Sequence, residues 1–225
     1  METVDKSTDN HLKSAILGIY AKQPLPGKVK TRLCPPLTPN EAAELYRCSL
    51  METVTRMKGG NFELAICYAG ERQWFAKTFP GVKLMTQRGA DLGARMSDSF
   101  NRFLQHGYNQ AVLIGSDAPD LPLKLVGQAF DTLQQTEVVL APADDGGYVL
   151  IGESMHHPEL FTTIQWSTDK VLPETLRRIT CLGIKAERLP GWDDLDDLEA
   201  LRRFLKRSPE STTALYLQQQ LAHCF

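Results

Sequence analysis

The chain has 225 residues, of which 42% are hydrophobic and 23% are charged, proportions that are typical of globular proteins and exclude disordered and fibrous classes. A formal net charge of −2 gives no general attraction to nucleic acid or to anionic membranes, so we expect neither as a partner. The five cysteines include no C-x-x-C pair, which argues against a disulfide framework or a structural zinc site. A reducing, cytoplasmic location is therefore predicted.

Residues 1–13 are polar and lack the apolar core of a secretory signal, so we predict a flexible N-terminal tail there. In residues 14–225, short apolar runs alternate with helix-length amphipathic stretches. No internal repeat or linker divides this region. The alternation predicts a single α/β domain.

The predicted strands are mostly continuous apolar runs, a pattern typical of strands that are covered on both faces. They are Ala15–Tyr20, Leu64–Tyr68, Val82–Met85, Ala111–Gly115, Val138–Pro142, Tyr148–Ile151 and Ile184–Leu189. Helices separate most of these strands. Right-handed crossovers are therefore expected, giving a mostly parallel, twisted sheet with helices on both faces.

The first predicted helix opens with Thr38-Pro39-Asn40-Glu41, a capping box with proline at the first helical position. The other predicted helices are Asp91–Gln105, Leu121–Gln134, Thr168–Thr180, Leu195–Lys206 and Ser211–Ala222. In open α/β sheets, ligands bind beyond the carboxyl ends of the strands. The loops that follow the strands are therefore the candidate site.

The loop after the first strand, AKQPLPGKVKTRL at residues 21–33, concentrates basic side chains. Lys22, Lys30 and Arg32 are among them, and Gly27 can expose backbone amides to an anion. In a nearly neutral chain this cluster favours a phosphate cradle. A solvated basic loop is the alternative, because neither G-x-x-x-x-G-K-[ST] nor G-x-G-x-x-G is present.

Carboxylates follow the buried strand Ala111–Gly115 in a turn that proline stiffens. Mg²⁺ takes one or two carboxylates together with phosphate oxygens and water, which makes Asp117 a candidate metal ligand. Asp120 could equally cap the helix that begins near Pro122.

A second acidic segment, WDDLDDLE at residues 192–199, holds five acids. Acids in the first turn of a helix are stabilised by its dipole, which accounts for Asp194, Asp196 and Asp197. Asp193 precedes the predicted helix. It is therefore the candidate second metal ligand, across from Asp117.

The segment PADDGGY joins two predicted strands, and its Asp-Gly and Gly-Gly pairs predict a hairpin turn. A plain turn explains the glycines but not the adjacent carboxylates or the tyrosine. We predict that Gly146, Gly147 and Tyr148 bind an acceptor substrate, with Asp145 as a polar contact or base. A plain hairpin remains the alternative.

Two further segments lead into predicted helices. In QRGADLGARM, the first amides of the helix can hold an anion or a base edge, with Asp91, Gly93 and Arg95 as candidate nucleotide contacts. A plain capping segment is the alternative. Trp166 and Ser167 are candidates to line the acceptor side.

Histidine chemistry is not favoured by the sequence. The side chains of the adjacent pair His156 and His157 should point apart, which argues against a shared metal. There is no G-x-S-x-G motif and no histidine at the end of a predicted strand. A Ser-His-Asp hydrolase is therefore not expected.

Six motifs occur in the order AKQPLPGKVKTRL, QRGADLGARM, LIGSDAPDL, PADDGGYVLIG, QWSTDKVLPETL and WDDLDDLEAL. Over about residues 15–201, they resemble the rSAM/selenodomain-associated transferase family, in the GT-A, nucleotide-diphospho-sugar transferase-like superfamily. That superfamily also holds the molybdenum cofactor and 2-phospholactate guanylyltransferases. The resemblance implies a single Rossmann-like GT-A domain that binds a nucleotide and Mg²⁺ or Mn²⁺.

The resemblance also implies roles for residues within these motifs. Lys22, Lys30 and Arg32 would contact phosphates, and Asp117 and Asp193 would bind the metal. The family's last motif commonly reads D-T-P-E-D-L. This chain has aspartate and leucine where that motif has threonine and proline.

Three functions follow from these features. In nucleotidyl transfer from an NTP to a small anionic or phosphorylated acceptor, charge builds on the departing pyrophosphate, where Lys30 and Arg32 would stabilise it while Asp145 orients the acceptor. In glycosyl transfer from a nucleotide sugar, the metal alone can neutralise the leaving group. The basic loop favours the first reaction. A nucleotide-binding regulatory module without turnover is the third possibility.

Overall fold

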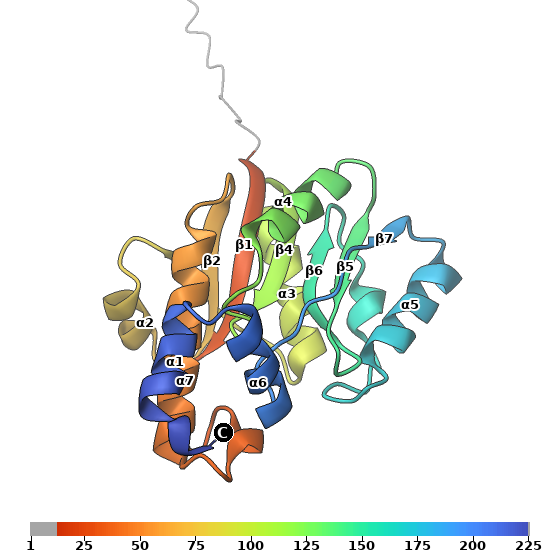
Figure 1. The fold of residues 1–225 in the computed structure, drawn as a ribbon. Coiled ribbons are helices and arrows are strands. Elements are labelled where there is room, and N and C mark those ends of the chain that lie inside the picture. The colour runs from red at the N-terminus through yellow and green to blue at the C-terminus, as the bar shows by residue number, and fades with distance from the viewer. Residues whose placement is uncertain (1–12, 225) are drawn as a thin grey trace, which may run out of the picture.

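The computed structural model describes residues 13–224, so all of the predicted tail except Lys13 lies outside the described residues. A seven-stranded sheet runs through this part of the chain in the order β3-β2-β1-β4-β6-β5-β7 (Figure 1). The strands are β1 Lys13–Lys22, β2 Glu63–Ala69, β3 Lys83–Thr86, β4 Tyr108–Gly115, β5 Val138–Pro142, β6 Tyr148–Glu153 and β7 Ala186–Arg188.

Within residues 13–224, β6 alone runs antiparallel to its neighbours, β4 and β5. The pairs β1–β2, β1–β4, β2–β3 and β5–β7 are parallel. The prediction of a mostly parallel α/β sheet is confirmed, and every predicted strand is present. Because β6 is reversed, the start of β6 lies beside the end of β4, which brings the DDGGY turn to the carboxyl edge of the sheet.

Helices cover both faces of the sheet. They are α1 Pro39–Met57, α2 Arg72–Thr78, α3 Leu92–Gln105, α4 Leu123–Thr132, α5 Val171–Leu182, α6 Leu198–Arg207 and α7 Thr212–Gln220. Short 3₁₀ helices are η1 Thr31–Leu33, η2 Pro158–Phe161 and η3 Ala222–Cys224. None of the helices described is long and apolar enough to cross a bilayer.

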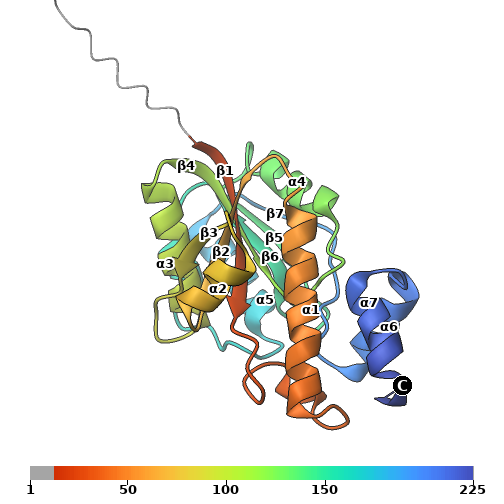
Figure 2. The same ribbon diagram turned by 90° about the vertical axis from the view of Figure 1, so that its left-hand side faces the viewer.

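Two apolar clusters fill the space between the sheet and its helices. One packs α1, α2 and α4 against one face, with Val54, Phe75 and Val126 fully or almost fully buried. The other packs α3 and α5 against the opposite face, through residues such as Phe100 and Ile179. Figure 2 shows α1 and α3 on opposite sides of the sheet. The predicted three-layer arrangement is confirmed.

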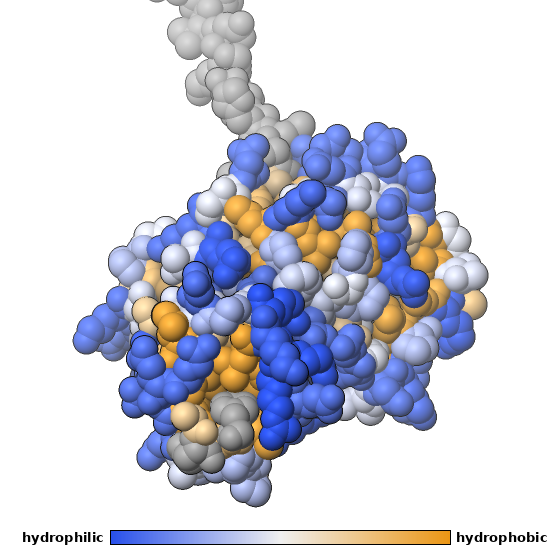
Figure 3. Space-filling view, viewed as in Figure 1, coloured by the Kyte–Doolittle hydropathy of each residue, from blue (hydrophilic) through white to orange (hydrophobic). Residues whose placement is uncertain are grey.

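A third cluster lies away from the sheet, where α6 and α7 pack beside η1 and α1 (Figure 2). Leu195, Phe204 and Leu217 are completely buried in it. The outward side of α6 is charged, and Figure 3 shows a strongly hydrophilic strip at its position. Two arginines of α6, Arg203 and Arg207, form ion pairs with Asp193.

The capping prediction for α1 is confirmed. The hydroxyl of Thr38 accepts from the backbone N–H of Glu41 at 3.3 Å, and the Glu41 carboxylate accepts from the backbone N–H of Thr38 at 2.7 Å. The helix α2 had no counterpart among the predicted helices. Its seven residues are too few for a 3.6-residue stripe to stand out.

The predicted start of the α6 helix was wrong. It begins at Leu198, where Asp197 caps it by accepting from the backbone N–H of Ala200 at 2.7 Å. Asp194 and Asp196 therefore precede the helix, and the helix dipole does not account for them.

The suggested capping role of Asp120 is also wrong. The start of α4 at Pro122 has no side-chain cap. Asp120 is 5% exposed and accepts hydrogen bonds from Arg207, Ser208 and Trp192. It ties the turn after β4 to the end of α6.

Both the backbone and the side chain of Leu195 hold the loop between β7 and α6 in place. The Leu195 N–H donates to the Asp117 carbonyl at 2.9 Å, which fixes this loop to the turn after β4. The Leu195 side chain, 0% exposed, anchors the same loop in the third apolar cluster. The carboxylates on either side of Leu195 depend on this anchor for their positions.

Replacing Leu195 with alanine should lower the free energy of unfolding by about 2–5 kcal/mol, because the loop loses buried apolar contacts and gains a cavity. Leu215→Ala is the matched control: Leu215 lies on α7 but is 42% exposed, so its change should stay within about 0.5 kcal/mol. Urea unfolding of both variants measures the difference. Equal losses would contradict the proposed anchoring.

Candidate functional site

A cavity of about 230 Å³ opens at the carboxyl edge of the sheet, where β1 and β4 end and β6 begins. Its apolar wall comes from both strands and helices. Six residues that the sequence singled out line it: Arg32, Asp145, Gly147, Tyr148, Trp166 and Ser167. Two that it assigned to a helix turn, Asp194 and Asp196, line it as well.

Three carboxylates converge at this cavity. Asp145 comes from the turn between β5 and β6, and Asp194 and Asp196 come from the loop before α6. One oxygen from each lies within 4.8 Å of the others. Asp145 is exposed and the other two are half-buried, so the group faces the cavity and solvent together. Within the described residues, these three carboxylates form the group whose spacing suits a metal ion.

The β5–β6 turn fixes the position of Asp145. Its carboxylate accepts from the backbone N–H of Gly147 at 2.9 Å. Gly146 has φ of +84°, and a Cβ there would lie 2.5 Å from the backbone of Asp169. Glycine is therefore required for the left-handed conformation and for the close approach of the segment before α5.

A buried cation lies beside the carboxylates. The Lys30 ammonium, with its side chain 4% exposed, lies 2.9 Å from Asp196 and 3.3 Å from Asp117. Lys30 adopts φ of +48° at the start of η1, an unusual conformation for a residue with a side chain. Burial opposes its charge, but Asp117 and then Asp196 outweigh it and raise the pKa of Lys30. Arg32 adds a contact with Asp196 at 3.2 Å.

The two half-buried carboxylates differ electrostatically. Burial, and then the charge of Asp196, raises the pKa of Asp194 to about 7. Burial also acts on Asp196, but the Lys30 ammonium outweighs it and holds that pKa below its usual value. Asp196 thus has cationic partners, whereas the negative charge around Asp194 is incompletely balanced.

The predicted metal pair, Asp117 and Asp193, differs from the carboxylates that the structure brings together. Asp193 lies against α6, where its carboxylate accepts from Arg203 at 3.1 Å and from Arg207 at 2.9 Å. One oxygen of Asp117 contacts Lys30, and the other is buried without a hydrogen-bond partner. The side chain that joins Asp145 and Asp196 at the cavity is Asp194.

Asp194 and Asp196 did carry a signal, since five acids stand among residues 193–199. The predicted helix was placed three residues too early, so a helix turn seemed to explain them. The loop conformation that exposes them depends on contacts with Asp117 and with the third cluster. Those contacts join residues that are far apart in sequence, so no local sequence pattern predicts them.

The other predicted nucleotide contacts lie outside the lining of this cavity. Lys22 ends β1 with its side chain exposed, and Gly27 lies in the exposed loop with φ of +72°. Asp91 caps α3 by accepting from the backbone N–H of Ala94 at 2.8 Å. Arg95 donates to the Gly89 carbonyl at 3.1 Å.

Gly93 was predicted to allow the close approach of a ligand. In the structure, two other parts of the protein, at Phe161 and Trp166, approach it closely. A Cβ at this position would lie 2.5 Å from the Phe161 carbonyl oxygen and from the Trp166 ring. Gly93 thus lets Trp166 pack against α3 while that ring lines the cavity.

The sheet order, the reversed β6 and the acidic cavity at its edge match the fold of nucleotide-diphospho-sugar transferase-like proteins. A protein from Desulfovibrio desulfuricans G20, provisionally named a nucleotide-diphospho-sugar transferase, matches with a TM-score of 0.86 and 33% identity over 93% of this chain and 96% of that one. Residues 50–168 match the family described as "Uncharacterized protein conserved in bacteria (DUF2064)". The chain belongs to this family.

Two more distant structures share the fold. CMP:2-keto-3-deoxy-manno-octonic acid synthetase in complex with CTP has a TM-score of 0.57 and 12% identity over 92% of this chain and 100% of that one. Rv0371c of Mycobacterium tuberculosis H37Rv in complex with manganese has a TM-score of 0.54 and 16% identity, covering 87% and 99%. No curated protein is significantly similar in sequence. The superfamily resemblance carried by the six motifs is confirmed.

Asp194→Asn should change how stability depends on pH. In the folded protein the pKa of Asp194 is about 7, against 3.8 for an ordinary aspartate. The folded state therefore binds this proton more tightly. This contribution to stability is present below about pH 4 and is lost as the pH rises towards about 7.

The asparagine variant should therefore gain stability relative to the wild type across this pH range, by at most about 1.4 kcal/mol per unit of pKa difference. Urea unfolding of both proteins in chelator-treated buffer at several pH values measures this gap. A gap that does not widen as the pH rises would contradict the assignment of the raised pKa.

Proposed function

We propose that this chain is a transferase that depends on a divalent metal and moves a nucleotidyl group from an NTP to a small anionic or phosphorylated acceptor. The observation that carries the proposal is the convergence of Asp145, Asp194 and Asp196 beside the buried Lys30 at the mouth of the cavity. The fold shared with nucleotidyltransferases supports it. A cytoplasmic location is part of the proposal.

The three carboxylates fit Mg²⁺ or Mn²⁺. Both ions prefer hard oxygen ligands, and Mg²⁺ commonly takes one or two carboxylates with phosphate oxygens and water. The raised pKa of Asp194 indicates negative charge that a bound cation would balance. Manganese in the complex of Rv0371c is consistent with such a site. When bound, the ion would neutralise phosphate oxygens as their charge develops.

The basic side chains of the loop at residues 21–33 have two different roles. Arg32, with its side chain 61% exposed, lines the cavity and can donate to phosphate oxygens while it contacts Asp196. Lys22 is exposed at the end of β1 and adds positive charge to this edge. Lys30 is too deeply buried to serve the same purpose, and we assign it the positioning of Asp117 and Asp196.

The acceptor would occupy the apolar part of the cavity. Tyr148 and Trp166 form its aromatic wall, Ser167 lies beside them, and Gly147 leaves the backbone accessible. The acceptor oxygen would attack the α-phosphorus as the bond from that phosphorus to the departing pyrophosphate breaks. Arg32 stabilises the charge on the leaving group, and the fixed walls hold the acceptor in line.

Glycosyl transfer from a nucleotide sugar is the second candidate, and two observations favour it. The Desulfovibrio protein, at 33% identity, carries a provisional name of that kind. In addition, Lys30 and Arg32 already contact carboxylates, so the loop offers less free positive charge than its sequence indicates. Only a test with both classes of donor separates the two reactions.

Asp145→Asn should abolish stabilisation by Mn²⁺ or Mg²⁺, because it removes one of three candidate ligands. Asp144→Asn is the matched control, since Asp144 is also exposed but lies outside the group of three. At a hundredfold excess of metal over Kd, the wild type and the control should gain about 2.7 kcal/mol. Thermal unfolding with and without metal measures the gain. Equal gains in both variants would exclude this metal site.

A panel of nucleotides with the metal present should separate the proposed reactions. We expect NTPs such as GTP or CTP to raise Tm more than UDP-sugars do, and a suitable acceptor to release pyrophosphate. Stabilisation by nucleotide sugars alone would replace the proposal with glycosyl transfer. Stabilisation by an NTP without turnover, across a range of phosphorylated acceptors, would favour a regulatory module.

A further inference from the structure

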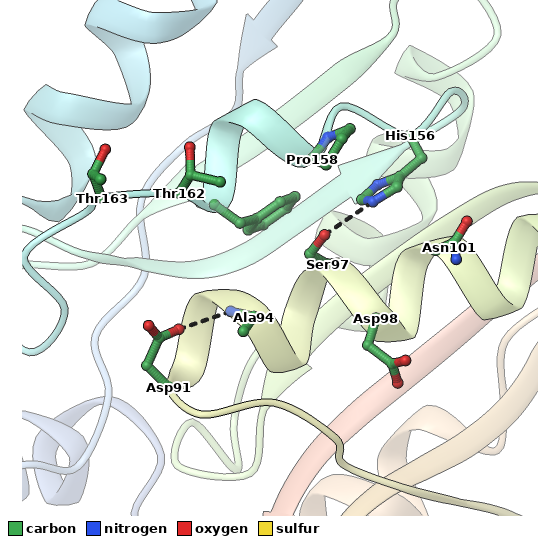
Figure 4. A pocket seen from close by; sticks show the side chains of 10 residues that line it. Asp91, Ala94, Ser97, Asp98, Asn101, His156, Pro158, Thr162 and Thr163 are labelled. Atoms are coloured by element: carbon green, nitrogen blue, oxygen red, sulfur yellow. Dashed lines mark hydrogen bonds between the residues drawn. The ribbon is translucent and has the colours of Figure 1, made fainter.

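A second and larger cavity lies on the α3 face of the sheet. Its volume is about 720 Å³, and it shares no lining residue with the cavity described above. Figure 4 shows α3 along one side and the segment from His156 to Thr163 along the other. The predicted nucleotide contact Asp91 lines this second cavity, not the first.

A chain of hydrogen bonds crosses the wall of this cavity. The Ser97 hydroxyl lies 3.0 Å from Nε2 of His156 (Figure 4). Nδ1 of the same ring lies 2.8 Å from the carboxylate of Glu153. Nucleophile, base and orienting acid are thus in contact in the order that acyl-transferring serine enzymes use. The sequence contains no G-x-S-x-G motif, so no sequence pattern indicated this arrangement.

The histidine ring is held in place by packing and by hydrogen bonds. Glu153, the last residue of β6, is completely buried. The imidazole stacks against Phe100 and Phe161, with interplanar angles of 27° and centroid distances of 6.4 and 6.1 Å. Its orientation is therefore fixed by packing as well as by hydrogen bonds.

The hydrogen bonds also select the tautomer. The Glu153 carboxylate accepts from the backbone N–H of His157 at 3.4 Å and lies 2.8 Å from Nδ1 of His156. When this carboxylate is ionised it can only accept, and Nδ1 of His156 then carries the ring proton. Nε2 is then free to accept the proton of the Ser97 hydroxyl, as a general base requires.

We propose that Ser97 and His156 are the catalytic residues of a second, acyl-transferring site, with Glu153 as the positioning residue. The class of substrate follows from the charges of the wall. Asp91 and Asp98 also line the cavity, where Asp91 caps α3 and Asp98 is paired with Arg102 at 3.2 Å. The lining itself contains no lysine or arginine that could bind an anionic group, so an uncharged ester or thioester is the expected substrate.

In the proposed reaction the Ser97 oxygen bonds to the acyl carbon as its proton moves to His156, and the carbonyl electron pair moves onto oxygen. When the carbonyl re-forms, the alcohol or thiol departs with the proton from His156. Water then repeats the sequence, which releases a carboxylic acid and restores Ser97. Asn101 lies one turn along α3 from Ser97 and lines the same cavity. Its side-chain amide would donate a hydrogen bond to the oxyanion.

The test is covalent labelling of the full-length protein with a fluorophosphonate, a reagent that phosphonylates activated serines. Peptide mass mapping should locate the label on Ser97. Ser97→Ala should abolish it, and His156→Gln should slow it by about 100-fold. Ser154→Ala is the matched control, since the Ser154 hydroxyl donates to the Thr136 backbone carbonyl at 2.9 Å. That variant should label at the wild-type rate.

Glu153→Gln tests the positioning role. It should lower the maximal labelling rate and leave the concentration of reagent at half-maximal rate unchanged, a split that general destabilisation would not produce. If this buried variant fails to fold, the first two variants still decide the matter. An unlabelled Ser97, or equal rates in the wild type and His156→Gln, would overturn the proposal. Metal- and nucleotide-induced shifts in Tm should survive in Ser97→Ala, so the two sites fail or succeed independently.

Discussion

The buried ammonium of Lys30 joins three parts of the chain that are far apart in sequence. It links η1 to the turn after β4 through Asp117 and to the loop before α6 through Asp196. A buried ion pair is costly to break, since removal of one partner leaves a charge without compensation, typically at 3–5 kcal/mol. The carboxylates at the cavity therefore keep their positions because Lys30 holds the surrounding loops. The same ammonium only partly offsets the burial of Asp194 and the negative charge of Asp196 beside it.

Much of the fold could be predicted from the sequence because its signals are local. Short apolar runs, most of them continuous, marked the strands, and the Thr38–Glu41 capping box marked the start of α1. The DDGGY turn announced the β5–β6 hairpin, and that hairpin reverses β6 within the sheet. Helix α2 and the true start of α6 were not predictable in this way. One is too short for periodicity, and the other is set by the Asp197 cap.

The candidate site was only partly predictable, for a physical reason. Loops at the carboxyl edge of a parallel sheet converge wherever the strands end, so Arg32, Asp145, Tyr148 and Trp166 reach one cavity. Which of two adjacent acids faces that cavity depends instead on distant partners. Arginines of α6 attract Asp193 to the outer side, and Asp194 is left to line the cavity.

The two cavities share a structural boundary although they share no lining residue. Phe161 lines the larger cavity and its carbonyl approaches Gly93, while Trp166 approaches the same glycine and lines the smaller one. A side chain at position 93 would displace both, because a Cβ there would lie 2.5 Å from each. Because position 93 is glycine, the segment from Phe161 to Trp166 can form a wall of both cavities. A movement of this segment at one cavity would therefore change the shape of the other.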